Sequence, residues 1–290
     1  MDVIIGAGIS GLVAATTRES VVLEEQHEVG GVYLVDEVSN IKIPGLPPFV
    51  EREKEILEIF PSAVIDELSL IVETVDDIHL KEKVCQRCLS LPSWLRPRKV
   101  LMIRNMSELF NSLKSKVKII RGYPVKISGN VLFSNRAPLE FKTLVNTGSR
   151  QRLDRIIGIN ENLDSIGCLI VTFTADKGLH SWDVLEYGKS STIFSHIFRL
   201  NLSDELDVYY VYSFYNKNKL PDVERVMQDL KRAGVVVRQN IYSMRAKYIQ
   251  ECILMGEKRK ERPQYVRDCG RLGLWENLSL SDAIGSALEC

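Results

Sequence analysis

The sequence has little of what marks several classes of protein. Its six cysteines are too few and too scattered over 290 residues for the disulfide scaffold of a small secreted domain. No apolar run approaches the roughly 18 residues that a membrane-spanning helix needs. Lys and Arg total 38, as do Asp and Glu, so no excess charge attracts nucleic acid. We therefore expect no nucleic-acid partner and no membrane span.

Only two cysteines lie close together, in Cys85-Gln86-Arg87-Cys88. Three interpretations stay open for this pair: incidental thiols, a local disulfide, or half of a zinc site. A structural zinc site normally needs four ligands, and no other cysteine or histidine stands at ligand spacing. This favours incidental thiols, and no metal is predicted.

The first residues follow a strand, turn, helix, strand pattern. Asp2 to Ile5 is strand-like, a helix runs from Ser10 to about Arg18, and Val21-Val22-Leu23 is a second strand. These lengths allow a right-handed βαβ crossover. Because the strand begins at residue 2, we expect no room for a signal or transit peptide and a cytoplasmic location.

Further elements are predicted from apolar periodicity and capping residues. Helices are expected over 51–60, 63–73, 221–233 and 281–288, with another beginning near Asn105. Strands are expected at 117–120, 125–127, 144–145, 169–173, 193–200 and 208–214. The fold class is therefore α/β, with a Rossmann-type dinucleotide-binding lobe and an inserted α+β substrate lobe on a mainly antiparallel sheet. The binding lobe is expected to comprise 1–50, 101–150 and 262–290, with a helical insertion at 51–100 and the substrate lobe at 151–261.

The glycines of Gly6-Ala7-Gly8-Ile9-Ser10-Gly11 match the dinucleotide-binding motif. In that motif the first glycine permits the tight turn, the second lets the backbone approach a pyrophosphate, and the third packs the helix against the strand. Ile9 and Ser10 then lie at a helix N-terminus, whose unpaired amides favour phosphate. A strand before the motif and a helix after it provide the required context.

An acidic residue stands at the end of the second strand. Glu24 lies 18 residues after Gly6, where a carboxylate can accept hydrogen bonds from both ribose hydroxyls of an adenosine. Glu25 is the alternative, although the pleat points it to the other face. These features serve NAD and FAD equally well.

Both ends of the chain resemble one flavoprotein superfamily. Asp2 to Leu12, Val22-Leu23-Glu24 and Val29-Gly30-Gly31 resemble the N-terminal signature of the amine oxidase, protoporphyrinogen oxidase and UDP-galactopyranose mutase superfamily. Cys269 to Leu278 and Ser281 to Ile284 resemble its C-terminal flavin motif. This second motif argues for FAD over NAD.

The resemblance implies which residues contact FAD. Gly30 and Gly31 would lie beside the pyrophosphate and flavin, and Val125 on the strand that reads adenine. Further contacts are implied for Thr147, Gly148, Gly270, Arg271, Asp282 and Ala283. The chain departs from the family at Val32, where an arginine is usual.

The resemblance also implies an activity: an FAD-dependent oxidoreductase that transfers hydride from a small-molecule substrate to flavin N5. Arg271, His180, Arg199 and Tyr212 are candidate catalytic residues, and His196 lies on the same predicted strand as Arg199. Two alternatives stay open, a mutase-like flavoenzyme without net redox change and an FAD-binding relative without catalysis. The substrate is not identified.

Overall fold

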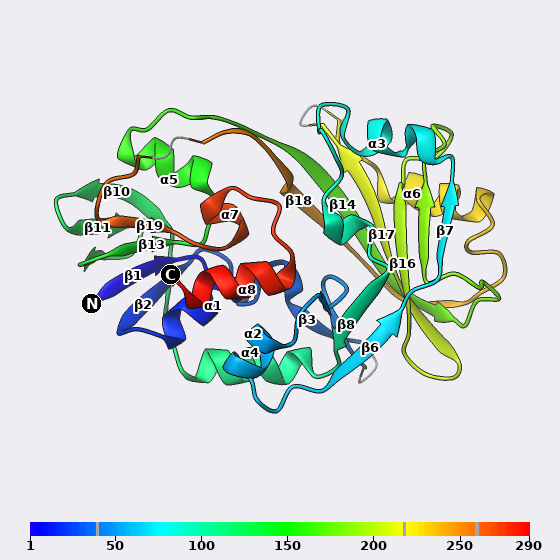
Figure 1. The fold of residues 1–290 in the computed structure, drawn as a ribbon, viewed down its shortest axis with the longest axis horizontal. Helices are drawn as coiled ribbons and strands as arrows, with labels where there is room; N and C mark the ends of the chain where they lie inside the picture. Colours follow the sequence, from blue (N-terminus) through cyan, green and yellow to red (C-terminus); the bar gives the residue numbers. More distant parts are fainter. Residues whose placement is uncertain (39–40, 217–218, 259–260) are drawn as a thin grey trace. The chain divides into compact units, whose positions relative to one another are not determined.

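The computed structural model describes residues 1–38, 41–216, 219–258 and 261–290 and divides into two compact units (Figure 1). Unit 1 comprises Met1–Glu67, Leu101–Leu163 and Gly256–Cys290, and unit 2 comprises Leu68–Val100 and Asp164–Met255. The segment 51–100, expected to form a separate insertion, is shared between the two units.

Unit 1 is built on a five-stranded parallel sheet. The strand order is β19 (Val266–Asp268), β13 (Leu144–Asn146), β1 (Asp2–Ile5), β2 (Ser20–Glu24) and β9 (Lys118–Arg121). Every neighbouring pair is parallel. Parallel strands expose their carboxyl ends at one edge of the sheet, where α/β proteins bind ligands. The turns after β1, β2, β13 and β19 therefore share that edge.

Apolar side chains cover both faces of this sheet. On one face, Ile4, Val22 and Val145 pack with helices α1 (Ile9–Thr16), α4 (Met106–Ser115) and α8 (Leu280–Leu288). On the other, Val3, Leu23 and Leu144 pack against helix α5 (Arg150–Ile157) and an antiparallel sheet of β10 (Pro124–Ser128), β11 (Val131–Ser134) and β12 (Pro138–Glu140). Because successive strand residues point to opposite faces, burial on both sides requires continuous apolar runs such as Val3-Ile4-Ile5.

The rest of unit 1 is made of short elements. They are the 3₁₀ turn η1 (Gly31–Tyr33), strands β3 (Val35–Val38), β4 (Ile41–Pro44) and β5 (Phe49–Val50), and helices α2 (Lys54–Ile59) and α7 (Gly270–Leu274). Strands β6 (Ile65–Ser69) and β8 (Lys99–Ile103) form a small sheet with β5 and carry the chain between the units. The helix predicted over 63–73 is wrong, because this segment forms β6 and the start of β7. Its alternating burial follows the period of a strand.

Unit 2 contains a six-stranded sheet in the order β18, β14, β17, β16, β15, β7. The strands are β7 (Val72–Val75), β14 (Asn162–Asp176), β15 (Val184–Tyr187), β16 (His196–Asn201), β17 (Leu206–Tyr215) and β18 (Ile241–Glu257). Helices α3 (Asp77–Cys85) and α6 (Val223–Arg232) and the 3₁₀ turn η2 (Ser93–Leu95) complete it. The β14, β15, β16 and β17 pairings are antiparallel, as expected for this lobe.

One face of the unit 2 sheet packs on α6. Val171, Val211 and Ile197 contact the same core as Val226 and Leu230 of the helix. The helix follows its predicted course, with Asp222 accepting a hydrogen bond from the Glu224 amide at its start. The 17-residue strand β18 was not predicted. As an edge strand it buries few side chains over its first ten residues, so the sequence there lacks an apolar run.

The structure pairs all six cysteines in three disulfides, Cys85–Cys88, Cys168–Cys252 and Cys269–Cys290. The interpretation of Cys85 and Cys88 as incidental thiols is therefore wrong, and the local disulfide is the one of the three interpretations that agrees with the structure. The other two bonds join cysteines 84 and 21 residues apart, a pairing that sequence spacing did not indicate. Tertiary structure alone brings these pairs together.

Within the described ranges, no helix has the length and hydrophobicity needed to cross a lipid bilayer. The predicted cytoplasmic location stays a prediction. The disulfides are relevant to this prediction of location, because disulfide bonds persist mainly in oxidising compartments and in the cells of hyperthermophiles.

Candidate functional site

The glycine motif forms the turn between β1 and α1, and its glycines meet different surroundings. A Cβ atom at Gly11 would collide with the carbonyl oxygen of Gly6, so the helix packs this closely only with glycine there. A Cβ atom at Gly8 would meet nothing within 4 Å. The backbone at Gly8 therefore borders open space, into which a ligand can approach.

The start of α1 faces this space with backbone donors. Gly8 is the N-cap and supplies no side-chain cap, and the first helical bond runs from the Leu12 amide to the Gly8 carbonyl. The first amides of a helix have no partner within the helix, and the helix dipole makes them attractive to anions. The side chain of Ser10 is bound to another segment, since its hydroxyl donates to the carbonyl of Ala283 at 3.2 Å.

Glu24 lies against the glycine turn at the end of β2. The residue is 8% exposed, and its carboxylate accepts hydrogen bonds from the backbone amides of Ala7 at 2.6 Å and Gln26 at 2.7 Å. Glu25 instead pairs with Arg152 at the surface. The structure therefore brings Glu24, and not Glu25, to the loop that carries Gly6 to Gly11.

The second glycine pair lies directly on the first motif. The Gly30 amide donates to the Ala7 carbonyl at 3.0 Å, and Gly30 pairs with Gly8 in an isolated bridge. Gly31 begins η1, which ends at Tyr33. Burial raises the pKa of the Tyr33 phenol, an effect that the nearby Arg271 guanidinium opposes. Tyr33 and Arg271 are thus close enough to interact, and Tyr33 was not singled out from the sequence.

The turn after β13 supports the glycine motif. The hydroxyl of Thr147 donates to the carbonyl oxygen of Ile5 at 2.8 Å and lies 3.1 Å from the carbonyl oxygen of Gly6. Gly148 follows at the same edge, where a Cβ atom would lie 3.4 Å from the Ile5 side chain. Val125, on β10, is 54% exposed. These three predicted residues all lie in unit 1, with Thr147 and Gly148 at the turn and Val125 on the covering sheet.

The C-terminal motif reaches the same turn through α7 and α8. A Cβ atom at Gly270 would collide with the Ser10 side chain, and the Gly270 amide donates to Ser286 of α8 at 2.8 Å. Ser279 caps α8 by accepting from the Asp282 amide, as its capping-box spacing predicts. Residues 10 and 270 thus touch although 260 positions separate them in the sequence.

Asp282 is held by charged partners. It accepts a hydrogen bond from Arg52 at 2.8 Å and one from the Ser279 hydroxyl at 2.9 Å. Although burial alone raises the pKa of Asp282, these hydrogen bonds hold it below its usual value. Asp282 is therefore an anion at neutral pH in the first turn of α8, where the helix dipole favours negative charge.

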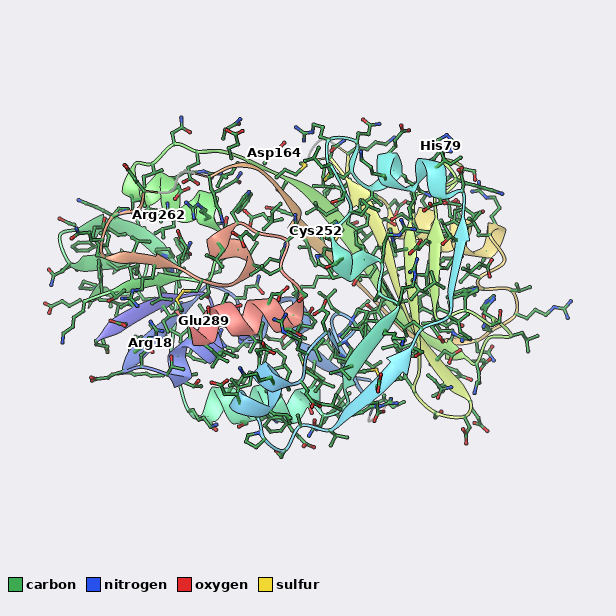
Figure 2. The ribbon with its side chains drawn as sticks, in the orientation of Figure 1. Arg18, His79, Asp164, Cys252, Arg262 and Glu289 are labelled. Carbon is green, nitrogen blue, oxygen red and sulfur yellow. A yellow bond between two sulfur atoms is a disulfide. The ribbon has the colours of Figure 1, made fainter. Side chains whose placement is uncertain are left out.

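A buried ionic network supports the ends of β13 and β19. Arg150 of α5 pairs with Glu161 and Asp268, each at 2.8 Å, and lies 3.4 Å from the Gly273 carbonyl of α7. Arg262, labelled in Figure 2, adds bonds to Asp154 and Asp268. The network joins α5 to the strand that precedes the C-terminal motif, and no sequence motif indicates it.

The candidate catalytic residues of unit 2 have partners within that unit. The His180 ring contacts the Val235 carbonyl at 2.8 Å and stacks on Trp182, and Arg199 donates to the His180 carbonyl and pairs with Asp183. These contacts fasten the segment before β15 to the sheet. His180 and Arg199 therefore have structural contacts, and a catalytic role for either stays a prediction.

Tyr212 lies on the opposite face of the unit 2 sheet from α6. Strand register places it beside His196, which lies beside Glu186 and Thr74 in turn. Burial lowers the pKa of His196 to about 3, and among the described residues its Nε2 atom has no hydrogen-bond partner. These four neighbouring residues could be predicted only in part from the sequence, because they come from four different strands.

The sequence matches no protein-family model and no curated protein. Solved structures are nevertheless similar over 99% of this chain. A candidate protoporphyrinogen oxidase from Exiguobacterium sp. 255-15 has a TM-score of 0.75 at 12% identity, over 97% of its own chain. Reduced UDP-galactopyranose mutase has a TM-score of 0.76 at 10% identity, over 94% of its chain. A triple mutant of putrescine oxidase has a TM-score of 0.68 at 10% identity, over 97% of its chain.

The chain has the fold of these proteins. The resemblance to the amine oxidase, protoporphyrinogen oxidase and mutase superfamily is thus confirmed at the level of the fold. The predicted combination of a parallel sheet with antiparallel sheets is confirmed as well. Within this amine oxidase-like fold, sequence reasoning missed Tyr33, Arg52 and Arg150, which lie outside any recognisable motif.

Proposed function

We propose that unit 1 binds FAD. The observation that carries the proposal is the open space at Gly8, bordered by the first amides of α1 and by Glu24. A pyrophosphate there would accept hydrogen bonds from the amides of Ile9 and Ser10. Glu24 would accept hydrogen bonds from the adenosine ribose. Gly30, Gly31 and Val125 would complete the dinucleotide contacts.

The C-terminal motif would hold the flavin end of the cofactor. Thr147, Gly148, Gly270, Arg271 and Ala283 would line it, and Asp282 would help to orient the start of α8. A helix N-terminus stabilises negative charge, which suits a reduced flavin. The contact between Ser10 and Ala283 supports this assignment, because it joins the pyrophosphate end of the proposed site to the flavin end.

The proposed activity is that of a flavin-dependent oxidoreductase acting on a small molecule. When bound, the flavin supplies the electron-accepting chemistry, with hydride passing from the substrate to N5. The protein residues bind and orient the cofactor. The shared fold with proteins named as oxidases supports this assignment. Arg271 is the best placed of the candidate side chains, because it lies within unit 1 on the flavin motif itself.

The cofactor proposal is tested by the colour of the protein and by one variant. Purified protein, or protein incubated with FAD, is expected to show the absorption of oxidised flavin. Gly8→Val is expected to fold normally, since nothing lies within 4 Å of its Cβ position, yet to lose FAD because the side chain fills the phosphate space. Gly285→Ala, in helix α8, serves as a control that keeps the cofactor. A colourless wild-type protein, or a yellow Gly8→Val protein, contradicts the proposal.

The reaction is tested by anaerobic reduction. Amines, porphyrinogens and polyenes are added separately, and bleaching of the flavin identifies an electron donor. If only reduced protein converts nucleotide sugars without consuming electrons, the oxidase assignment fails in favour of the mutase alternative. If no compound class bleaches or is converted, the binding-only alternative gains support.

A further inference from the structure

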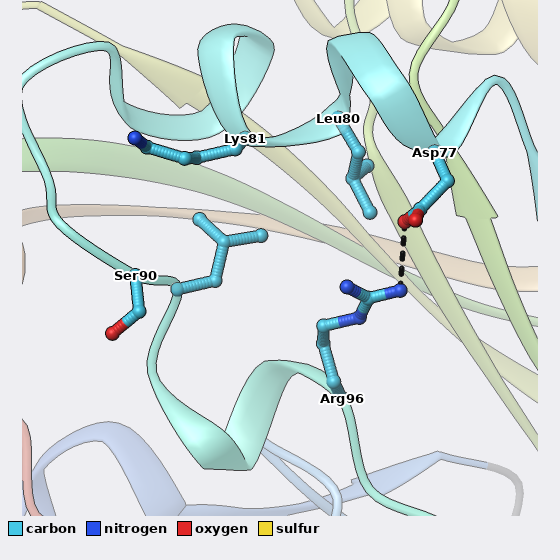
Figure 3. Close-up of a pocket in the computed structure, with 6 residues that line it drawn as sticks. Asp77, Leu80, Lys81, Ser90 and Arg96 are labelled. Carbon is cyan, nitrogen blue, oxygen red and sulfur yellow. Dashed lines mark hydrogen bonds and ion pairs between the residues drawn. The ribbon is translucent and has the colours of Figure 1, made fainter.

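Unit 2 contains a cavity that the proposed cofactor site does not use. It has a volume of about 280 Å³ and lies between α3 and the segment that leads to η2 (Figure 3). Its lining combines apolar, hydroxyl and charged groups, contributed by Asp77, Leu80, Lys81, Ser90, Leu91 and Arg96. All six residues belong to unit 2.

The walls of this cavity are held in place. Leu80 is 1% exposed and anchors α3 to the interior of the unit. The Cys85–Cys88 disulfide ties the end of α3 to the loop that carries Ser90 and Leu91. A site whose walls are fixed before binding loses little conformational entropy when a ligand enters.

Arg96 projects a rigid guanidinium into the cavity. Its Nε and Nη2 atoms donate to Glu186 at 3.2 and 2.7 Å, and Nη2 also donates to Asp77 at 2.8 Å. Glu186 is fully buried and is further fixed by Arg98 and Thr74. Arg96 thus makes three hydrogen bonds, and its partner Glu186 is held by two more. The Arg96 guanidinium therefore has little freedom to move.

One edge of this guanidinium has no protein partner. Among the described residues, the Nη1 atom of Arg96 forms no hydrogen bond or ion pair, although a guanidinium carries five N–H donors in total. Figure 3 shows this nitrogen turned away from Asp77, toward the space beside Leu80, whereas Ser90 lies across the cavity. Two N–H groups are therefore available to a ligand in the cavity.

Charge around the cavity favours an anion. Lys81, Arg96 and Arg98 carry three positive charges, and Asp77 and Glu186 carry two negative ones. Leu80 and Leu91 add an apolar surface that an inorganic anion would not use. The lining thus combines a cationic donor with a hydrophobic wall.

We propose that this cavity binds a small organic carboxylate. One carboxylate oxygen accepts a hydrogen bond from Arg96 Nη1, and the lining residue Lys81 contributes a second positive charge. The short hydrocarbon body of the ligand packs against Leu80 and Leu91. Charge-assisted hydrogen bonds to arginine are the strongest contacts in this arrangement.

Calorimetric titration of the whole purified protein with butyrate tests the proposal. Saturable binding of butyrate is expected, with at least tenfold weaker binding of butyramide, because the amide carries no charge. Inorganic phosphate is expected to bind more weakly than butyrate, because it gains nothing from Leu80 and Leu91. Absence of saturable butyrate binding, or equal binding of butyrate and butyramide, overturns the proposal.

Variants assign the binding to this cavity. Leu91→Trp fills it and is expected to abolish binding, and Asp77→Asn removes a like charge and is expected to tighten binding several-fold. Arg87→Lys is the matched control, because Arg87 pairs with Asp164 and does not line the cavity. Unchanged affinity in Leu91→Trp, with the protein folded by circular dichroism, places the ligand elsewhere and overturns the assignment.

Discussion

The candidate residues that the sequence offers in the two units differ in their surroundings. In unit 1, the glycine turn borders open space at Gly8 and lies at the start of a helix without a side-chain cap. In unit 2, His180 and Arg199 have structural contacts instead, since Arg199 donates to the backbone carbonyl of His180 and the His180 ring stacks on Trp182. The difference teaches that the backbone features on which the proposed binding function rests can be recognised in the sequence, whereas the side chains of His180 and Arg199 do not by themselves distinguish a site from a scaffold.

Disulfide removal gives the largest expected difference between the units. In the chain-entropy model, the 84-residue separation of Cys168 and Cys252 stabilises unit 2 by about 4–5 kcal/mol, and the 21-residue separation of Cys269 and Cys290 stabilises unit 1 by about 3 kcal/mol. The Cys168→Ala/Cys252→Ala protein is therefore expected to unfold more easily than Cys269→Ala/Cys290→Ala in denaturant titrations.

A thiol titration checks the disulfides themselves. Denatured, unreduced protein is expected to show no free thiol, and reduced protein all six. Free thiols in the unreduced protein would contradict the pairing on which the stability ranking depends.

Replacing Arg150 and Arg199 compares how much the ionic contacts of unit 1 and unit 2 contribute to the free energy of unfolding. Arg150→Met removes the ion pairs of Arg150 with the buried carboxylates of Glu161 and Asp268, of which Asp268 keeps its bond to Arg262, and is expected to cost about 3–5 kcal/mol. Arg199→Met should cost less, about 1–2 kcal/mol, because Asp183 is partly solvated and the buried Asp207, 3.8 Å from Arg199, keeps its hydrogen bond from the Gly178 amide. Equal losses in the free energy of unfolding would show that the two networks are equivalent.

Glu24 and Glu25 form a matched pair for the cofactor site. Glu24→Ala is expected to weaken FAD binding by about 2–3 kcal/mol, because two hydrogen bonds to a charged acceptor are lost. Glu25→Ala should leave the affinity nearly unchanged, since that carboxylate pairs with Arg152 at the surface. Fluorescence titration of apoprotein with FAD measures both. A larger effect at Glu25 would reverse the assignment.

His196 gives a pH dependence of the stability that is confined to unit 2. Burial holds the pKa of His196 near 3, below the ordinary value of 6.5, so the unfolded chain takes up the proton first. The stabilising contribution is complete above pH 6.5 and is lost as pH falls toward 3, by about 1.4 kcal/mol per pH unit.

Urea titrations between pH 7 and 4.5 measure this slope. His196→Asn is expected to flatten it. His79→Asn is the control with the opposite sign, because Asp76 raises the pKa of His79 through a hydrogen bond. Identical slopes for wild type and His196→Asn would mean that His196 is not buried as a neutral ring.

Local sequence signals predicted unit 1 better than unit 2. The β1 and β2 strands, the turn between them and the capped helix α8 follow from contiguous residues, so short-range rules suffice. The prediction for the segment 63–73 failed because its apolar residues fit a helix and a strand alike, and sheet pairing decided between them. Strand β18 was missed because an edge strand needs little apolar surface of its own.

By itself, the sequence determined the glycine turn, the acid that follows it and the resemblance of both termini to one flavoprotein superfamily. The physical reason is that a tight turn, a close backbone approach and a helix start each constrain neighbouring residues. Only the tertiary structure decided the disulfide pairs, the Arg150 network, the contact between Ser10 and Gly270, and the free edge of Arg96. These depend on residues far apart in the chain, and no short-range rule relates them.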